Sequence, residues 1–483
     1  MSSVNKQSVR EEAERLENEF DSLIAQKKLE PDVQVLFKSM LLLLRLLISI
    51  FLEKTTKKNS KNSGKPSSQT EKDESALSKK GTKSKGKEES HTNFNNTRVK
   101  ETVTIRKVTF CDVCGQDLSK EPCQGHERRT KIDIIFEKVV EHVDAEIKHC
   151  QICDSTVKGD FPTDMPGPLQ YGNGLKAYVI NLLVAQMVAM NRVQKLVTSM
   201  IGAVIAEATM LKFVLRLHQS LAHWEESAIE QLMKAPTMHV DETSLRVDKK
   251  NHWIHVYSSG DITLKRLHKK RGKEAINDIN IIPLYGGKII HDCWASYFAY
   301  DECGHGLCGA HLVRELAYVV ESNQYAWASN MKRLLLATCK VVSKRKRKTL
   351  TKNEYANLQK RYRNIITRGE KELPEIPAKP NGKRGKIAKS DAHNLWERLK
   401  EHEKAVLLFA KDPYVPFTNN RAERDLRMAK VKQKVSGCFR KEVYAQAYCR
   451  ISSYLQSMAN KGYNPLVAIQ MVLNGEEMLE WGE

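Results

Sequence analysis

The sequence predicts a multidomain α/β protein, and three observations carry this prediction. The chain has 483 residues, a length that suggests two to four domains rather than one. Its apolar content of 41% is sufficient for packed cores. Short β-branched and aromatic runs in the second half are surrounded by long stretches with helical periodicity, which is the pattern of an α/β core.

Residues 1–54 are predicted to be a helical region, and residues 55–100 a basic flexible linker. Few Gly or Pro residues interrupt Glu12–Glu53, and Leu41–Phe51 is apolar on nearly every face. That run needs a partner, so a coiled coil, a dimerisation helix and a plain packed helix remain open. In residues 55–100, Lys, Ser, Asn, Thr and Gly dominate, and apolar side chains are too few to form a core.

Residues 101–160 are predicted to be a small zinc-binding module. They contain two Cys-x-x-Cys pairs, separated by 35 residues: Cys111 with Cys114, and Cys150 with Cys153. Two such pairs complete a tetrahedral Zn²⁺ site, which is closed and therefore structural, and the module is expected to bind DNA. Cys123 or His126 can replace one ligand, and four unligated cysteines are the alternative. The spacer is expected to fold as a hairpin, with Ile132–Val140 supplying strands.

Residues 170–435 are predicted to be the α/β core. Helical periodicity covers about Gly174–Met233. Three short runs bounded by polar or Gly residues then predict strands at Pro236–Val240, His252–Ser258 and Lys288–His291.

A helical insertion is predicted at about residues 310–415. The helical pattern returns there, and the segment contains the basic run Lys344–Lys348 and a Pro-rich break at Pro374–Pro380. Residues 436–483 are predicted to form a C-terminal helical region.

The charge balance favours a polyanionic partner. The chain carries 79 Lys and Arg residues against 58 Asp and Glu residues, a formal net charge of +21. This surplus favours DNA or RNA, and the alternative is a basic soluble protein without a nucleic-acid ligand. Six basic residues recur on and beyond one helix, where they are candidates for contacts to the DNA backbone: Arg421, Arg424, Arg427, Lys430, Lys432 and Lys434.

Cysteine usage and hydropathy predict a soluble cytoplasmic protein. Eleven cysteines are an odd number and are clustered, which suits free thiols and metal ligands in a reducing compartment. Met1–Lys28 is polar and charged, so no secretory signal is predicted. The apolar run Met40–Leu52 is too short to span a bilayer and contains Arg45.

Three carboxylates stand out by their settings. Asp241 and Asp292 each follow a predicted strand, and Glu423 lies at the start of a basic helix. Carboxylates at the ends of adjacent strands converge, and their hard oxygen ligands suit Mg²⁺. Two such ions about 4 Å apart activate the attacking oxygen and stabilise the leaving oxygen of a phosphoryl displacement.

Each carboxylate also has a structural interpretation. Asp241 and Asp292 are compatible with turn residues at strand ends. Glu423 is compatible with a capping box with Asn420, or with an i,i+4 partner of Arg427.

Six segments together resemble the IS-sixty-six family of insertion-sequence transposases over nearly the whole chain. They are Asn59–Ser68, the double Cys-x-x-Cys module, Val240–Thr243, Cys308–Arg314, Asn419–Arg424 and Gly462–Pro465. The Asn-Asn-x-Ala-Glu-Arg element at Asn419–Arg424 is the most specific of them. The linker is longer and richer in Lys than is expected for the family, and the 35-residue spacer departs from its pattern.

The resemblance implies a ribonuclease-H-like core with an Asp-Asp-Glu triad at Asp241, Asp292 and Glu423. Asp301 is the alternative second member, and His311 and Arg314 are candidates for supporting the phosphate or the active site. The implied reaction, with Mg²⁺ or Mn²⁺, is hydrolysis at the transposon ends, followed by attack of the freed 3′-hydroxyl on target DNA.

The resemblance also implies partners and a place of action. The partners are transposon terminal inverted repeats, target DNA, other copies of the chain in a homo-oligomer, and small element-encoded accessory proteins. The expected place is the nucleoid in the cytoplasm of a prokaryotic cell. The competing hypotheses are a non-enzymatic, zinc-dependent DNA-binding regulator, and a nuclease of the same fold that cuts without joining.

Overall fold

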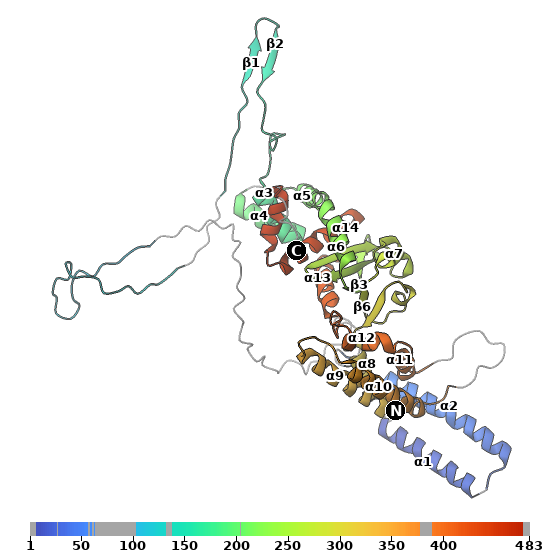
Figure 1. Ribbon diagram of the computed structural model, residues 1–483. Helices are drawn as coiled ribbons and strands as arrows, with labels where there is room; N and C mark the ends of the chain where they lie inside the picture. The colour runs from blue at the N-terminus through green and yellow to red at the C-terminus, as the bar shows by residue number, and fades with distance from the viewer. Residues whose placement is uncertain are drawn as a thin grey trace, which may run out of the picture. The chain divides into compact units, whose positions relative to one another are not determined.

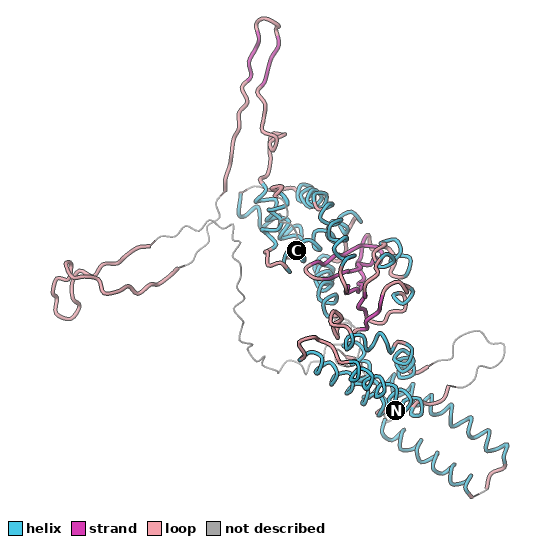
Figure 2. The backbone as a smooth tube through the Cα atoms, viewed as in Figure 1, coloured by secondary structure: helices cyan, strands magenta, loops and turns pink. Residues whose placement is uncertain are grey.

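A computed structural model describes residues 6–26, 28–56, 58, 59, 62, 103–131, 138–202, 204–376 and 389–476. These belong to two compact units, one drawn from residues 1–88 and 222–457 and the other from residues 89–221 and 458–483. The described part of the chain contains fifteen α-helices and two β-sheets (Figure 1, Figure 2), which confirms the prediction of a mixed α/β protein.

The first unit contains a five-stranded sheet in the order β5-β4-β3-β6-β7. Its antiparallel part is β3 (Thr237–Val247), β4 (Lys250–Ser259) and β5 (Ile262–His268). The strands β6 (Lys288–His291) and β7 (Gly304–Leu307) run parallel to β3, which is the central strand.

The sheet is more extensive than the sequence predicts. The first predicted strand ends at Val240, whereas β3 continues to Val247, so the expectation that Asp241 lies at the end of a strand is wrong. The extension is stabilised by β4, which pairs with β3 as far as Val247. The strands β5 and β7 are not predicted at all.

Four helices cover or flank this sheet: α6 (Ala222–Lys234), α7 (Lys273–Ile279), α13 (Asn420–Ser436) and α14 (Glu442–Asn460). The helix α13 packs on β3 and β4. Its buried Asp425 accepts hydrogen bonds from Ser258 Oγ at 2.7 Å and from Thr263 Oγ1 at 3.0 Å. This carboxylate fixes the helix against the antiparallel part of the sheet, because both donors are buried with it.

Five helices lie between β7 and α13: α8 (Gly309–Asn323), α9 (Ala326–Lys344), α10 (Lys352–Glu372), α11 (Asp391–Glu401) and α12 (Glu403–Lys411). They share one hydrophobic core that includes Trp327, Tyr362 and Trp396. The Trp396 indole donates to the Ile366 carbonyl at 2.9 Å, so its polar atom is satisfied inside the core.

The first unit also contains α1 (Lys6–Ala25) and α2 (Pro31–Thr55). The two helices pair through stacked Phe20 and Phe37 rings, whose centroids lie 5.7 Å apart, and through an ion pair between Arg45 and Glu17.

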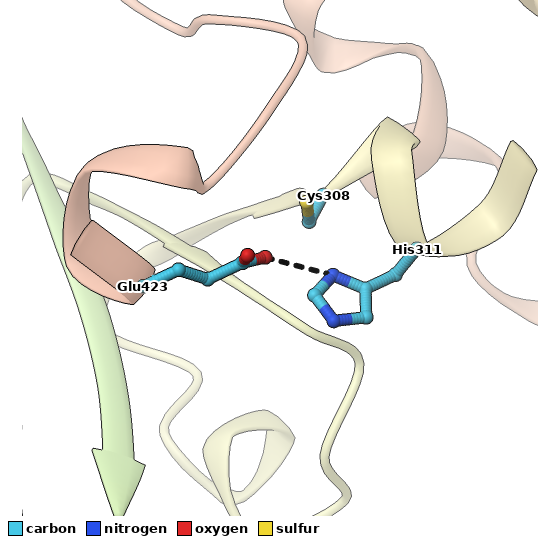
Figure 3. Close-up of side chains that lie close together, drawn as sticks. All are labelled: Cys308, His311 and Glu423. Atoms are coloured by element: carbon cyan, nitrogen blue, oxygen red, sulfur yellow. Dashed lines mark ion pairs between the residues drawn. The ribbon is translucent and has the colours of Figure 1, made fainter. Parts of the chain in front are cut away.

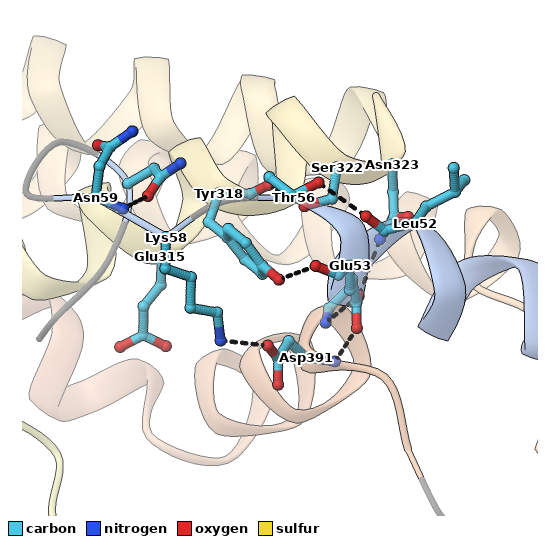
Figure 4. A network of polar contacts seen from close by, with 12 residues as sticks. Leu52, Glu53, Thr56, Lys58, Asn59, Glu315, Tyr318, Ser322, Asn323 and Asp391 are labelled. Atoms are coloured by element: carbon cyan, nitrogen blue, oxygen red, sulfur yellow. Dashed lines mark hydrogen bonds and ion pairs between the residues drawn. The ribbon is translucent and has the colours of Figure 1, made fainter. Parts of the chain in front are cut away.

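The C-terminal end of α2 is fixed to α8 and α11 by the buried residue Glu53 (Figure 4). The Glu53 carboxylate accepts hydrogen bonds from the backbone N–H groups of Asp391 and Ala392 and from the Asn323 amide. It therefore caps the N-terminus of α11, which lies far away in the sequence.

By length and composition, α2 is the one described helix that is apolar enough to cross a membrane. It has 25 residues, whereas the apolar run expected to be too short to span a bilayer was Met40–Leu52. Leu46, Ser49, Leu52 and Glu53 are buried within the first unit, and 17% of its most apolar 18-residue window is buried.

The second unit contains a helical group and a separate hairpin. The group comprises α3 (Asn173–Ile180), the π-helix η3 (Asn181–Ala185), α4 (Met190–Ile201), α5 (Glu207–Ser220) and α15 (Pro465–Leu473). In the Gly-Tyr-Asn-Pro segment, Asn464 caps α15 by accepting from Val467 N at 2.9 Å, and Pro465 follows at the first helical position. This segment therefore has a structural role at the start of α15.

The hairpin consists of β1 (Ile147–Cys150) and β2 (Ser155–Lys158). It encloses the second Cys-x-x-Cys pair, whereas the predicted strands were placed at Ile132–Val140. Of that range, residues 132–137 lie outside the described residues, and the described residues 138–140 form no strand.

Candidate active site

The register of the parallel strands brings Asp241 and Asp292 into one row. His239 on β3 pairs with Ile290 on β6, so the residues two positions further along each strand are Asp241 and Asp292. The next strand continues the row, because His291 pairs with Leu307 and the following residues are Asp292 and Cys308. The row lies just beyond the parallel pairing, at the carboxyl ends of β6 and β7.

A sharp turn directs the chain away after Asp292. Cys293 has a φ of +72°, a left-handed conformation that is uncommon outside glycine. The Asp292 carboxylate closes this turn by accepting from Trp294 N at 3.1 Å. The Asp292 side chain is half-buried and its orientation is fixed by its own backbone.

The buried His291 and the half-buried His305 stabilise the other side of this turn. Cys293 N donates to His291 Nδ1 at 3.2 Å, and His291 Nε2 lies 3.1 Å from His305 Nδ1. His305 Nε2 in turn lies 3.1 Å from the Tyr300 carbonyl oxygen.

The two ends of this chain of hydrogen bonds determine both tautomers. The Tyr300 carbonyl only accepts and the Cys293 N–H only donates, so each ring carries one proton, on Nε2. Burial lowers the pKa of His291 and of His305, which agrees with two neutral rings. Sequence reasoning missed this relay.

Glu423 reaches the same region from the first turn of α13. The start of the helix is fixed by buried Asn419, whose amide donates to the Val240 carbonyl at 2.8 Å. The Asn419 Oδ1 atom lies 2.8 Å from His239 Nδ1. Since Val240 directly precedes Asp241, this contact joins the start of α13 to β3 beside the Asp241–Asp292 row.

The local partners of Glu423 come from α8 and not from its own helix. Its Oε1 atom lies 3.5 Å from His311 Nδ1 (Figure 3). The same oxygen lies 3.8 Å from Arg314 Nη2. The side chain of the cap residue, Asn419, accepts no hydrogen bond from the first turn of α13, so the capping-box interpretation of Glu423 does not describe this helix start. Among the ion pairs of the described residues, none joins Glu423 to Arg427.

The Cys308 and His311 side chains interact with each other. Burial raises the pKa of the Cys308 thiol, but hydrogen bonding to His311 and the charge of His311 outweigh it, and the net pKa is lowered. Burial lowers the pKa of His311, yet Cys308 and Glu423 overcome this and raise it to about 9. A positive charge on His311 is thus stabilised next to the Glu423 carboxylate.

The electrostatics at the Asp241–Asp292 row are dominated by negative charge. Burial raises the pKa of Asp241 well above its usual value, and the charges of Glu242 and Asp292 raise it further. Like charges within a few ångströms disfavour ionisation of each other. The charge of His311 opposes this shift but does not cancel it, and such an excess of negative charge is expected of a site for metal ions.

Glu242 is held apart from this row by its own partners. It is buried, forms an ion pair with Arg271 at 2.6 Å, and accepts from the Tyr297 hydroxyl at 2.6 Å. The Arg271 guanidinium stacks on the Trp294 and Trp253 rings, with its carbon 4.4 and 5.0 Å from their centroids. Glu242 therefore has two side-chain partners, whereas Asp241 accepts one hydrogen bond, from the backbone of Glu242. In the sequence, the only indication that Glu242 belongs to the site was its position next to Asp241 in the Val240–Thr243 segment.

The donor set fits hard divalent cations. Asp241, Asp292 and Glu423 supply carboxylate oxygens, the ligands that Mg²⁺ and Mn²⁺ prefer. The Glu423 Oε1 atom is also buried and makes no hydrogen bond within the described structure, so it has capacity for a further ligand.

Asp301, the alternative second member, lies elsewhere. It is exposed and precedes the amino end of β7. The strands β6 and β7 are parallel, so the amino end of β7 lies at the opposite end of these strands from Asp292.

The six basic residues of α13 divide into two groups. Arg424, Arg427 and Lys434 are exposed. Arg421 donates to the Ile262 carbonyl at 3.0 Å, and Lys430 donates to the Ser244 carbonyl at 2.8 Å. These two side chains, and the half-buried Lys432, are partly withdrawn from solvent.

The four cysteines of the predicted zinc module lie in two local pairs. Hydrogen bonds within the first turn, from Cys114 and its neighbour, lower the pKa of Cys111. Hydrogen bonds from Ser155 and Cys150 lower the pKa of Cys153. Cys123 Sγ lies 3.8 Å from His126 Nε2. Among the described residues, the four cysteines are not gathered around one point.

A family model described as "Transposase IS66 family" matches residues 168–447, which is more than half of the chain. The matched range includes the whole five-stranded sheet, the helices α8–α12 and Glu423 on α13. A comparison with curated proteins found no match.

Proposed function

Because the chain belongs to the IS66 family of transposases, we propose that it cuts DNA at transposon ends and joins those ends to target DNA through an Asp-Asp-Glu triad. The triad comprises Asp241, Asp292 and Glu423, on a ribonuclease-H-like core. The mixed sheet with β3 at its centre supports this fold.

The observation that carries the proposal is the alignment of Asp241 with Asp292, beside the helix that carries Glu423. The strand register aligns Asp241 with Asp292, and the contacts of α13 with β3 bring Glu423 to the same end of the sheet. Burial raises the pKa of Asp241, repulsion from Glu242 and Asp292 raises it further, and ionisation of this carboxylate is therefore costly in a protein without a ligand. Such a cost is typical of a site that binds cations.

The chain's own residues hold and orient the reactants. Asp241, Asp292 and Glu423 are the ligands for Mg²⁺ or Mn²⁺. When bound, these ions activate the attacking oxygen and stabilise the leaving oxygen of an in-line displacement. His311 and Arg314 orient Glu423, and their positive charges lie where a DNA phosphate approaches the triad.

The remaining parts of the chain have proposed roles in DNA binding and assembly. Arg424, Arg427 and Lys434 contact the DNA backbone, and the helices α8–α12 form an insertion domain at about residues 310–415. Residues 101–160 hold a structural Zn²⁺ through Cys111, Cys114, Cys150 and Cys153, and contribute to DNA binding. Two transposon ends must be brought close to each other, so the working form is a homo-oligomer acting on the nucleoid.

The test is strand cleavage and joining on DNA that flanks the gene, with Mg²⁺ or Mn²⁺. The variants are Asp241→Asn, Asp292→Asn and Glu423→Gln, and DNA binding is measured for each. Asp301→Asn is the matched control, because it removes an exposed carboxylate that precedes the amino end of β7, away from Asp292.

Each outcome discriminates between the hypotheses. Products that require metal, disappear in the three triad variants and persist in Asp301→Asn support the proposal. Products that survive in the triad variants would overturn the site. Cleavage without joining indicates the nuclease hypothesis, and DNA binding without products, also with accessory proteins, indicates the regulator.

A further inference from the structure

Three different metal-binding atoms converge beside the triad (Figure 3). Cys308 offers a sulfur, His311 a ring nitrogen and Glu423 a carboxylate oxygen, and all three atoms lie within 4.8 Å of one another. In the part of the chain that the structure describes, this is the one group of three or more such side chains at that spacing. The Mg²⁺ chemistry of the triad does not use the sulfur or the ring nitrogen.

The local structure organises these atoms before any ion binds. Cys308 is the cap residue of α8 and His311 lies in its first turn, so one helix fixes both. Asn419 N donates to the Cys308 sulfur at 3.1 Å, a contact that stabilises a thiolate. The His311 Nδ1 and Glu423 Oε1 atoms are buried, 3.5 Å apart, and make no hydrogen bond within the described structure.

We propose that Cys308, His311 and Glu423 bind a borderline transition metal, for which Zn²⁺ is the best-suited ion. Sulfur and imidazole ligands select Zn²⁺ over Mg²⁺, and three protein ligands leave a fourth tetrahedral position for water. One thiolate and one carboxylate balance the charge of the ion, and binding releases to solvent the proton that His311 carries in the absence of metal. Arg314, 3.8 Å from Glu423, competes for the carboxylate and weakens the site.

Occupancy of this site has a consequence for the reaction. It rests on the proposed function, because Glu423 is shared between the two sites. A Glu423 carboxylate bound to Zn²⁺ with Cys308 and His311 is withdrawn from the Mg²⁺ ligands. Zn²⁺ is therefore an inhibitor whose effect Mg²⁺ opposes.

The site is tested by titrating Co²⁺, a spectroscopic substitute for Zn²⁺, into the full-length chain. A thiolate bound to Co²⁺ gives a near-ultraviolet charge-transfer band, and the cysteines of residues 101–160 contribute equally in all variants. We expect Cys308→Ser to lower the intensity of this band by the contribution of one Co²⁺ per chain. Cys449→Ser, which replaces a buried cysteine outside the group, should leave the intensity unchanged. His311→Asn should weaken Co²⁺ binding at this site at least about tenfold.

The spectra do not depend on DNA cleavage, so they distinguish failure of this proposal from failure of the triad. Identical Co²⁺ spectra and stoichiometry for wild type, Cys308→Ser and His311→Asn would overturn the metal site. In the cleavage assay, each variant is normalised to its own activity without Zn²⁺. The inhibitory consequence is wrong if Cys308→Ser and wild type are equally sensitive to Zn²⁺.

Discussion

Glu53 is buried and the Asp241–Asp292 row is half-buried, and the two regions have opposite surroundings. Glu53 is 4% exposed and accepts hydrogen bonds from two backbone N–H groups and the Asn323 amide. Asp241 accepts one hydrogen bond, from the adjacent backbone of Glu242, and the nearby charges of Glu242 and Asp292 oppose its ionisation.

This difference separates a structural carboxylate from a candidate ligand. A buried acceptor that is saturated by donors has no capacity left for an ion and stabilises the fold. A row of carboxylates with few donors has capacity for cations, and it costs stability in their absence. The two regions should therefore respond in opposite ways to the loss of a carboxylate.

The largest expected effect is the loss of Glu53. Glu53→Ala leaves the N–H groups of Asp391 and Ala392 and the Asn323 amide without their acceptor, so we expect the free energy of unfolding to fall by about 3 kcal/mol. The measurement is denaturant unfolding of the full chain. Lys58→Ala is the matched control, because it removes an exposed ion pair with Asp391 and should cost less than about 1 kcal/mol. Equal losses in the two variants would contradict a structural role for Glu53.

Asp241→Asn should have the opposite sign. Without divalent ions the substitution removes a repelled carboxylate, and we expect a gain of about 1 kcal/mol in the free energy of unfolding. Mg²⁺ should raise the Tm of wild type and not that of the variant. Asp301→Asn, an exposed carboxylate, should change neither value. If Asp241→Asn destabilises the chain as Glu53→Ala does, the contrast between the two regions is wrong.

The sequence predicted the residue types of the candidate site but not the contacts that fix them. The strand at Lys288–His291 is confirmed with the predicted bounds. The strand β7, Gly-His-Gly-Leu, was missed, because glycine weakens a strand and only its parallel pairing with β6 stabilises it. Without β7, neither the His291–His305 relay nor the place of Cys308 beside Asp292 can be deduced.

Contacts between residues far apart in the sequence also could not be predicted from the sequence. Glu53 lies at the end of a recognisable helix, but the backbone that it caps is 338 residues further along the chain. The strand β5 was missed for a similar reason. Its Lys265 is buried beneath α14, where Ser453 Oγ accepts a hydrogen bond from the Lys265 backbone N–H. The sequence does not predict a buried strand here, because lysine is a charged residue that is rarely buried.

The His291–His305 relay tests whether the turn after Asp292 depends on satisfied polar groups, as the Glu53 region does. His305→Leu leaves the buried His291 N–H without an acceptor, so we expect a loss of about 1–2 kcal/mol in the free energy of unfolding and a higher Mg²⁺ requirement for cleavage. His305→Asn can place an oxygen near the lost Nδ1 and should restore part of both. An unchanged Mg²⁺ requirement in His305→Leu would show that the relay does not position Asp292.

Glu354 repeats the helix cap of Glu53 at the surface, and its effect should be the smallest. It forms a capping box with Thr351 and an ion pair with Arg345, and the hydrogen bond from Arg345 lowers its pKa to about 2. Because the folded pKa is below the unfolded value, the stabilisation is present above about pH 4.5 and is lost as the pH falls toward 2.

The Tm difference between wild type and Glu354→Gln should therefore be constant near neutral pH and should narrow steadily below about pH 4.5. The measurement is the Tm of both proteins across this range at low and high salt, since solvent screens an exposed pair and salt should reduce the difference. A difference that does not change with pH would mean that the Gln side chain disturbs the helix start for a reason other than charge. If Glu354→Gln costs as much as Glu53→Ala, burial is not what distinguishes the two caps.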